Sequence, residues 1–110
     1  MIQFEKYKDG LIALFEDDKV IKKLYVFGSA LTSGFNEQTS DIDILIETEE
    51  LTNPEEKGES LITLWDNLEQ LFNRKVDLLT ENSLRNPFLK KEIDQTKKLV
   101  YDGQNKQIFI

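Results

Sequence analysis

The 110-residue sequence carries 14 basic and 21 acidic side chains, a formal net charge of −7, and contains neither cysteine nor histidine. This composition excludes disulfide scaffolds, zinc sites built from cysteine or histidine and every Ser-His-Asp mechanism, so any catalysis must use carboxylates. It also disfavours DNA as a partner, because binding a nucleic-acid backbone needs a basic surface. No apolar run approaches the roughly 18 residues that span a bilayer, and the N-terminus lacks the apolar core of a signal peptide. We therefore expect one cytoplasmic domain, residues 1–110, without a membrane partner.

Three segments in the first half of the chain have a clear periodicity. Residues 3–18 place apolar side chains at helical spacing, which predicts an amphipathic helix. Residues 24–27 (LYVF) are a short apolar run stopped by Gly28, which is typical of a buried strand. Residues 41–47 (DIDILIE) alternate as a strand does, with isoleucines on one face. The opposite face carries Asp41, Asp43, Leu45 and Glu47. One face of this strand is therefore expected in the core, and the other carries charge.

Two Asn-Pro pairs in the second half mark helix starts, since asparagine caps a helix and proline fits its first position. Asn53-Pro54 precedes an unbroken i, i+3, i+4 stripe of apolar residues that runs to Phe72. Asn86-Pro87 opens a further helix to about Lys97. The side chains expected to face inward from this last helix are Phe88, Leu89 and Ile93.

The remaining segments complete an α/β pattern. Residues 75–80 (KVDLLT) predict a strand with Val76 and Leu78 on one side and Asp77 and Leu79 on the other. Residues 99–101 and 107–110 predict a terminal hairpin across a polar turn. Its last three residues either pack on their own sheet or form an interaction surface; they are Ile108, Phe109 and Ile110.

Asp41 and Asp43 form an Asp-x-Asp pair. It is distinguished from the other acidic pairs by its position on a strand, not by how often such pairs occur. Acidic pairs at this spacing occur at 16/18, 41/43, 47/49 and 92/94, about the number that the composition gives by chance. At 41/43 both residues are aspartates on a strand whose alternate positions are isoleucine, so the carboxylates project side by side and repel each other. Two interpretations are open: a cation-binding pair, or an exposed strand face with solvated carboxylates.

Gly28-Ser29 and Asp77 each allow a functional and a structural interpretation. The dipeptide directly follows a buried strand, where backbone N–H groups and a hydroxyl can contact an anion, or where the chain simply turns. Asp77 lies mid-strand among apolar neighbours. It is either a third carboxylate of the same site or an edge-strand charge paired with Lys75.

Taken together, Gly28-Ser29, Asp41-Ile-Asp43 and Asp77 on a later strand resemble the polymerase-beta-type nucleotidyltransferases. Within that superfamily the chain resembles the minimal nucleotidyltransferases, single domains of this size that are usually encoded beside a HEPN-domain toxin. The resemblance covers roughly residues 20–102, including the segments FGS, SDIDILIE and NRKVDLLTENSL. It implies a two-layer nucleotidyltransferase fold, a mixed β-sheet with helices packed on one face.

The resemblance also implies roles for individual residues. Gly28 and Ser29 would hold the phosphates of a nucleoside triphosphate, ATP being the donor. Asp41 and Asp43 would bind two Mg²⁺ ions, and Asp77 would be the third carboxylate, a ligand of the catalytic metal that helps to activate the attacking hydroxyl. Two-metal sites of this kind stabilise both the attacking and the leaving oxygen in phosphoryl and nucleotidyl transfer.

The sequence departs from the family pattern at one point. Members of the family commonly carry an arginine just after the Gly-Ser pair or a few residues later, whereas residues 30–40 here contain neither Lys nor Arg. Either catalysis is weak, or Arg74, Lys75 or a residue of a partner supplies the missing charge.

The first hypothesis is transfer of AMP from ATP to a hydroxyl, expected on a tyrosine of a HEPN-type toxin, which gives an antitoxin role. The alternative is an inactive or weakly active binding module that neutralises a partner by occlusion. A small-molecule nucleotidyltransferase is disfavoured because 110 residues leave no acceptor domain. The sequence is also compatible with a homo-oligomer.

Overall fold

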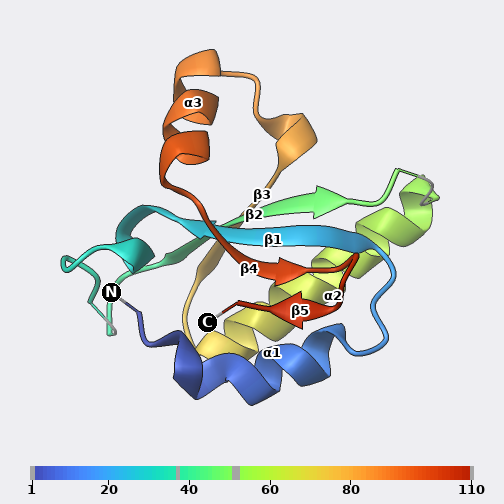
Figure 1. The fold of residues 1–110 in the computed structure, drawn as a ribbon, viewed down its shortest axis with the longest axis horizontal. Helices are drawn as coiled ribbons and strands as arrows, with labels where there is room; N and C mark the ends of the chain where they lie inside the picture. The colour runs from blue at the N-terminus through green and yellow to red at the C-terminus, as the bar shows by residue number, and fades with distance from the viewer. Residues whose placement is uncertain (1, 37, 51–52, 110) are drawn as a thin grey trace.

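The computed structural model describes residues 2–36, 38–50 and 53–109, which form a mixed sheet with helices on both sides (Figure 1). The strands are β1 (Ile21–Phe27), β2 (Ile42–Thr48), β3 (Val76–Thr80), β4 (Lys98–Asp102) and β5 (Gln107–Ile108). Their spatial order is β3-β2-β1-β4-β5. Only β2 and β3 run parallel, and the other neighbours are antiparallel. The expected α/β class with a mixed sheet is confirmed.

The α-helices are α1 (Lys8–Phe15), α2 (Pro54–Phe72) and α3 (Pro87–Thr96). The predicted helix over residues 3–18 begins as a short 3-10 helix, η1 (Phe4–Tyr7), and its α-helical part ends at Phe15. Both predicted asparagine caps are confirmed. The Asn53 side chain accepts a hydrogen bond from the N–H of Glu55 (2.9 Å), and that of Asn86 accepts one from the N–H of Phe88 (3.0 Å). None of the helices in the described ranges is both long and apolar enough to cross a membrane.

The main hydrophobic core lies between the sheet and the pair α1 and α2. The isoleucine face of β2 points into it, as its alternation predicts. Phe15 and Tyr101 stack in this core, with ring centroids 4.0 Å apart and planes 7° from parallel. Other members include Leu11, Leu24, Val26, Ile42, Ile44, Ile46, Leu64, Leu68, Phe72, Val76 and Val100. The face of the sheet that carries the aspartates is therefore the opposite one.

Helix α3 stands on that opposite side, across the sheet from α1 and α2 (Figure 1). Packing on one face, expected of all the helices, thus holds for α1 and α2 only. Ile93 is buried as predicted, but Phe88 and Leu89 are 84% and 42% exposed, so their predicted inward orientation is wrong. The reason is that α3 approaches the sheet only toward its C-terminal end, where Ile93 is buried and the ammonium of Lys97, just after the helix, lies 4.2 Å from the centroid of the Tyr25 ring.

The predicted terminal hairpin is present, because β5 pairs antiparallel with β4. Ile108 packs against the main core, which agrees with packing on the protein's own sheet. Phe109 is 40% exposed, and Ile110 lies outside the described residues.

Candidate active site

The parallel pairing of β2 with β3 brings two of the predicted aspartates together. Asp43 and Asp77 are register partners in this ladder, so their side chains leave the same face of the sheet. The two carboxyl groups lie within hydrogen-bonding reach of each other, and the charge of Asp41, just before β2, also acts on Asp43. Asp43 and Asp77 therefore lie together on the sheet face opposite the core, and Asp41 is close enough for its charge to act on Asp43.

Helix α2 fixes the start of β3, the strand that carries Asp77. The indole N–H of Trp65 donates a hydrogen bond to the carbonyl oxygen of Val76 (2.7 Å). The carboxylate of Glu69 accepts one from the N–H of the same residue (3.0 Å). Both polar backbone groups of the residue before Asp77 are thus held by one helix.

The surroundings of Asp43 favour its protonated form. Partial burial raises the pKa of the Asp43 carboxyl above its ordinary value, and the negative charge of Asp77 raises it further. A hydrogen bond with Asp77 and the charge of Asp41 act in the same direction. Two carboxyl groups held this closely are satisfied by a shared proton or by a cation.

Gly28 places the end of β1 against the Asp43 carboxylate. Its φ of +75° lies in the left-handed region, and a Cβ built at this position would collide with the Asp43 carboxylate oxygen. Gly28 and Ser29 begin a short 3-10 helix, η2 (Gly28–Leu31), and both are exposed to solvent. Glycine is therefore required here both by the backbone conformation and by the closeness of a carboxylate.

The proposed structural interpretation of Asp77 also has support. Asp77 lies on the edge strand β3, and its carboxylate is 3.8 Å from the Lys75 ammonium. The two side chains are 45% and 66% exposed, so this ion pair contributes little to stability. It leaves the Asp77 carboxyl beside that of Asp43 and places a positive charge at the edge of the site.

Arg74, the other basic residue considered as a phosphate ligand, is engaged with the chain segment before β2. Its guanidinium lies 4.9 Å from the centroid of the Phe35 ring. It donates hydrogen bonds to the carbonyl oxygens of Asn36 (3.4 Å), Ser40 (3.5 Å) and Phe72 (3.3 Å). Arg74 thus fixes the segment that leads into Asp41, and Lys75 is the basic residue beside the carboxylates.

A second carboxyl pair, Glu47 with Glu81, lies farther along the same face and was not predicted. Burial raises the pKa of Glu47, and a hydrogen bond with Glu81 and the charge of Glu81 raise it further. The sequence contains a signal for this pair, because each glutamate follows one of the paired aspartates by four positions. Strand alternation returns Glu47 to the face of Asp43, and Glu81 directly follows the end of β3. Burial and Glu47 also raise the pKa of the nearby Tyr25.

The Glu47–Glu81 pair predicts a pH dependence of stability. Because folding raises the pKa of Glu47 above its ordinary value of 4.5, the contribution of Glu47 to stability is full below that value and is lost as the pH rises through the folded-state pKa. Glu47→Gln removes this titration, so the variant should lose less stability than the wild type between pH 4 and pH 7. Urea unfolding across this range measures it. Glu92→Gln, at an exposed position of α3, is the control. Parallel pH profiles for wild type and Glu47→Gln would contradict the pairing.

Within residues 2–36, 38–50 and 53–109, no group of three or more acidic side chains is arranged to hold a metal ion on its own. Magnesium in phosphate-transferring sites is typically held by one or two carboxylates together with substrate phosphates and water. Asp43 and Asp77 supply two such carboxylates, and these repel each other when both are ionised. The donor set present therefore fits Mg²⁺ bound together with a nucleotide.

The fold and the paired carboxylates are those of an enzyme that transfers nucleotidyl groups. Residues 9–106 match the family described as "Polymerase beta, Nucleotidyltransferase". The chain therefore belongs to this nucleotidyltransferase family, and the resemblance drawn from Gly28-Ser29, the Asp-x-Asp pair and Asp77 is confirmed.

Relatives in Methanocaldococcus jannaschii share substantial identity with the chain. "Putative protein adenylyltransferase MJ1379" is 34% identical over 82 residues, which cover 74% of this chain and 79% of the relative. "Putative protein adenylyltransferase MJ0126" is 43% identical over 77 residues, covering 68% of this chain and 71% of the relative.

Solved structures share the fold at lower identity. A chain in the structure of a tri-AMPylated Shewanella oneidensis HEPN toxin in complex with MNT antitoxin superposes with a TM-score of 0.58 and 21% identity, covering 94% of this chain and 76% of that one. A chain in the structure of a toxin-antitoxin with AMP-PNP gives a TM-score of 0.60 and 22% identity, covering 89% and 75%. These matches confirm the nucleotidyltransferase fold.

Proposed function

We propose that this chain is a metal-dependent adenylyltransferase that transfers AMP from ATP to a hydroxyl group of a partner protein. The observation that carries the proposal is the Asp43–Asp77 carboxyl pair, placed against Gly28 on one face of the sheet. The adenylyltransferase names of the relatives favour AMP as the transferred group. We also infer that residues 1–110 act as one domain, since a single sheet joins all the described strands.

Asp41, Asp43 and Asp77 would hold two Mg²⁺ ions together with the triphosphate. When bound, such ions neutralise the charge that develops on the attacking and leaving oxygens. The raised pKa of Asp43 supports this assignment, because the site disfavours two ionised carboxylates without a cation. Metal binding would therefore compete with protonation of the Asp43 carboxyl.

The chain's own groups would position the reactants. The backbone N–H groups of the Gly28-Ser29 turn and the Ser29 hydroxyl would donate to phosphate oxygens, which the exposed position of both residues permits. Asp77 would accept a hydrogen bond from the acceptor hydroxyl and take its proton. The acceptor oxygen then bonds to the α-phosphorus while the bond to the β-phosphate oxygen breaks, and pyrophosphate leaves with its electron pair.

A HEPN-type toxin is the acceptor that we propose, with a tyrosine hydroxyl as the group modified. The support is that the chain shares its fold with a chain of a HEPN toxin–MNT antitoxin complex in which the toxin is tri-AMPylated. Transfer of AMP would inactivate the toxin and make this chain its antitoxin.

One observation favours the alternative, neutralisation by occlusion without catalysis. Residues 30–40 lack a basic side chain, and Arg74 is occupied with backbone carbonyls of the segment before β2. Lys75 would then have to supply the positive charge near the phosphates, at an exposed position where its effect is weak.

Label transfer from ATP distinguishes the two functions. The protein is incubated with magnesium, the HEPN-domain protein of the same genome, and ATP labelled at either the α- or the γ-phosphate. We expect label from α-ATP alone on the HEPN protein, and none when the metal is chelated. Stable complex formation and neutralised toxicity without label would establish the occlusion module instead.

A further inference from the structure

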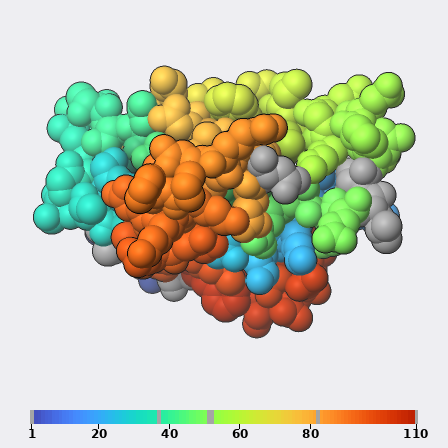
Figure 2. All heavy atoms as spheres, turned by 90° about the horizontal axis from the view of Figure 1, so that it is seen from above, coloured from blue at the N-terminus to red at the C-terminus, as the bar shows by residue number. Residues whose placement is uncertain are grey.

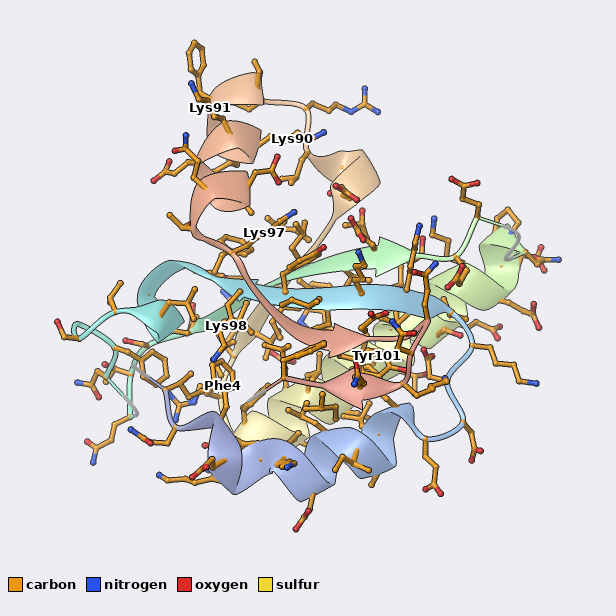
Figure 3. The ribbon with its side chains drawn as sticks, viewed as in Figure 1. Phe4, Lys90, Lys91, Lys97, Lys98 and Tyr101 are labelled. Atoms are coloured by element: carbon orange, nitrogen blue, oxygen red, sulfur yellow. The ribbon has the colours of Figure 1, made fainter. Side chains whose placement is uncertain are left out.

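The N-terminal part of α3 presents large apolar side chains to solvent. Phe88, at 84%, is the most exposed large hydrophobic side chain among the described residues, and Leu89 beside it is 42% exposed. This end of the helix projects away from the rest of the protein (Figure 3), where Lys90 and Lys91 are labelled. We call the surface formed by Arg85, Phe88, Leu89, Lys90 and Lys91 the α3 tip.

The α3 tip is also basic in an acidic protein. Residues 85–98 contain five basic and two acidic side chains, although the whole chain has a net charge of −7. Lys97 is paired with Asp94 (3.0 Å), and Lys98 lies over the Phe4 ring (5.4 Å). Over the part of the chain that the structure describes, the basic side chains of the α3 tip have no ion pair or hydrogen bond. Their charge is therefore available to an outside partner.

The α3 tip rises from the face of the sheet that bears the carboxylates. Lys97, the residue that directly follows α3, lies over the ring of Tyr25, which pairs in register with Leu45, two residues from Asp43. Seen from above in Figure 2, the atoms of α3 stand in front of the strands. A protein bound at the α3 tip would thus lie on the same side of the sheet as the candidate active site.

We propose that the α3 tip docks the acceptor protein, with Phe88 inserted into an apolar pocket and the tip's basic side chains paired with carboxylates around that pocket. The proposal rests on the proposed transferase function and adds how the acceptor is recognised. A second copy of this chain is a poorer occupant, because a symmetric contact would bring two basic tips together. A nucleic acid is poorer too, because the net charge of −7 repels its backbone.

Two variants of the α3 tip test the proposal against the HEPN-domain protein of the same genome. Phe88→Ala removes the apolar anchor, and Lys90→Glu with Lys91→Glu reverses the charge. Ile62→Ala, at a 64% exposed position of α2, and Lys8→Glu with Lys19→Glu, both exposed, are the matched controls. Binding is measured by calorimetry, and transfer of labelled AMP gives KM for the acceptor protein.

We expect each tip variant to bind the acceptor at least about tenfold more weakly and to raise its KM, while the controls stay near the wild type. Binding by the wild type should weaken with added salt, and binding by the charge-reversed variant should not. The melting-temperature rise with magnesium and ATP should be unchanged in every variant, because the α3 tip lies outside the nucleotide site.

Two results would overturn the docking surface while leaving the transferase intact. One is label transfer with unchanged acceptor affinity and KM in both tip variants. The other is self-association of the wild type, seen by analytical ultracentrifugation and abolished by Phe88→Ala. In contrast, absence of both label transfer and a magnesium–ATP melting shift in the wild type would reject the transferase function, and with it the docking of an acceptor.

Discussion

Replacing Asp43 with asparagine should reduce nucleotidyl transfer by about a hundredfold or more, as expected when a charged group that organises the reacting phosphates is removed. The same change should leave the metal-free protein as stable as the wild type or more stable by about 0.2–1 kcal/mol, because it relieves a like-charge pair across the β2–β3 ladder. A residue selected for packing or capping would give the opposite sign of stability change.

Melting temperatures with and without magnesium and ATP measure both effects without knowledge of the acceptor. Ligand binding to the folded state should raise the melting temperature of the wild type, and Asp43→Asn should lose most of that rise. Asp66→Asn, at an exposed position of α2, is the control for loss of one negative charge. Equal ligand-induced shifts in wild type and Asp43→Asn, or a less stable metal-free variant, would contradict the assignment of Asp43.

Gly28→Ala should destabilise the protein by about 1–3 kcal/mol and abolish transfer. A non-glycine residue at a φ of +75° is strained, and the added methyl group would displace the Asp43 carboxyl from its position beside Asp77. Denaturant unfolding gives the stability change, and labelled ATP gives the activity.

Gly58→Ala is the matched control for this substitution. Gly58 lies inside α2, and a Cβ built there would meet no atom within 4 Å. The alanine should therefore stabilise the helix by about 0.5–1 kcal/mol and leave activity unchanged. If Gly28→Ala behaved as Gly58→Ala does, the close approach of Gly28 to Asp43 would have no role in the site.

Local patterns were sufficient to predict most elements, whereas the meeting of Asp43 with Asp77 was expected from the family resemblance. The alternation of residues 41–47 placed Ile42, Ile44 and Ile46 in the core and left the aspartates on the other face. The Asn53 and Asn86 caps set two helix starts, because a short side chain and the following proline act only on neighbouring backbone groups. Such features depend on residues close in sequence, which a pattern can contain.

Contacts between distant segments were beyond this kind of prediction. The hydrogen bonds of Arg74 to Asn36 and Ser40 depend on how a loop meets the end of α2, which periodicity does not encode. Periodicity also identifies the apolar positions of α3, but it does not show how far the sheet extends beneath the helix. Ile93 is therefore buried, whereas Phe88, about 1.4 turns earlier in the helix, is 84% exposed.

The hydrogen bond from Trp65 to Val76 gives the protein an internal optical reporter. Trp65 is the single tryptophan of the chain, and its indole bonds to the residue that precedes Asp77. Because a hydrogen-bonded indole emits differently from one in water, we expect the fluorescence of this partly exposed side chain to follow the docking of β3 against α2. Stopped-flow mixing with nucleotide and magnesium could then separate movement at the Asp77 strand from the chemical step, without any attached dye.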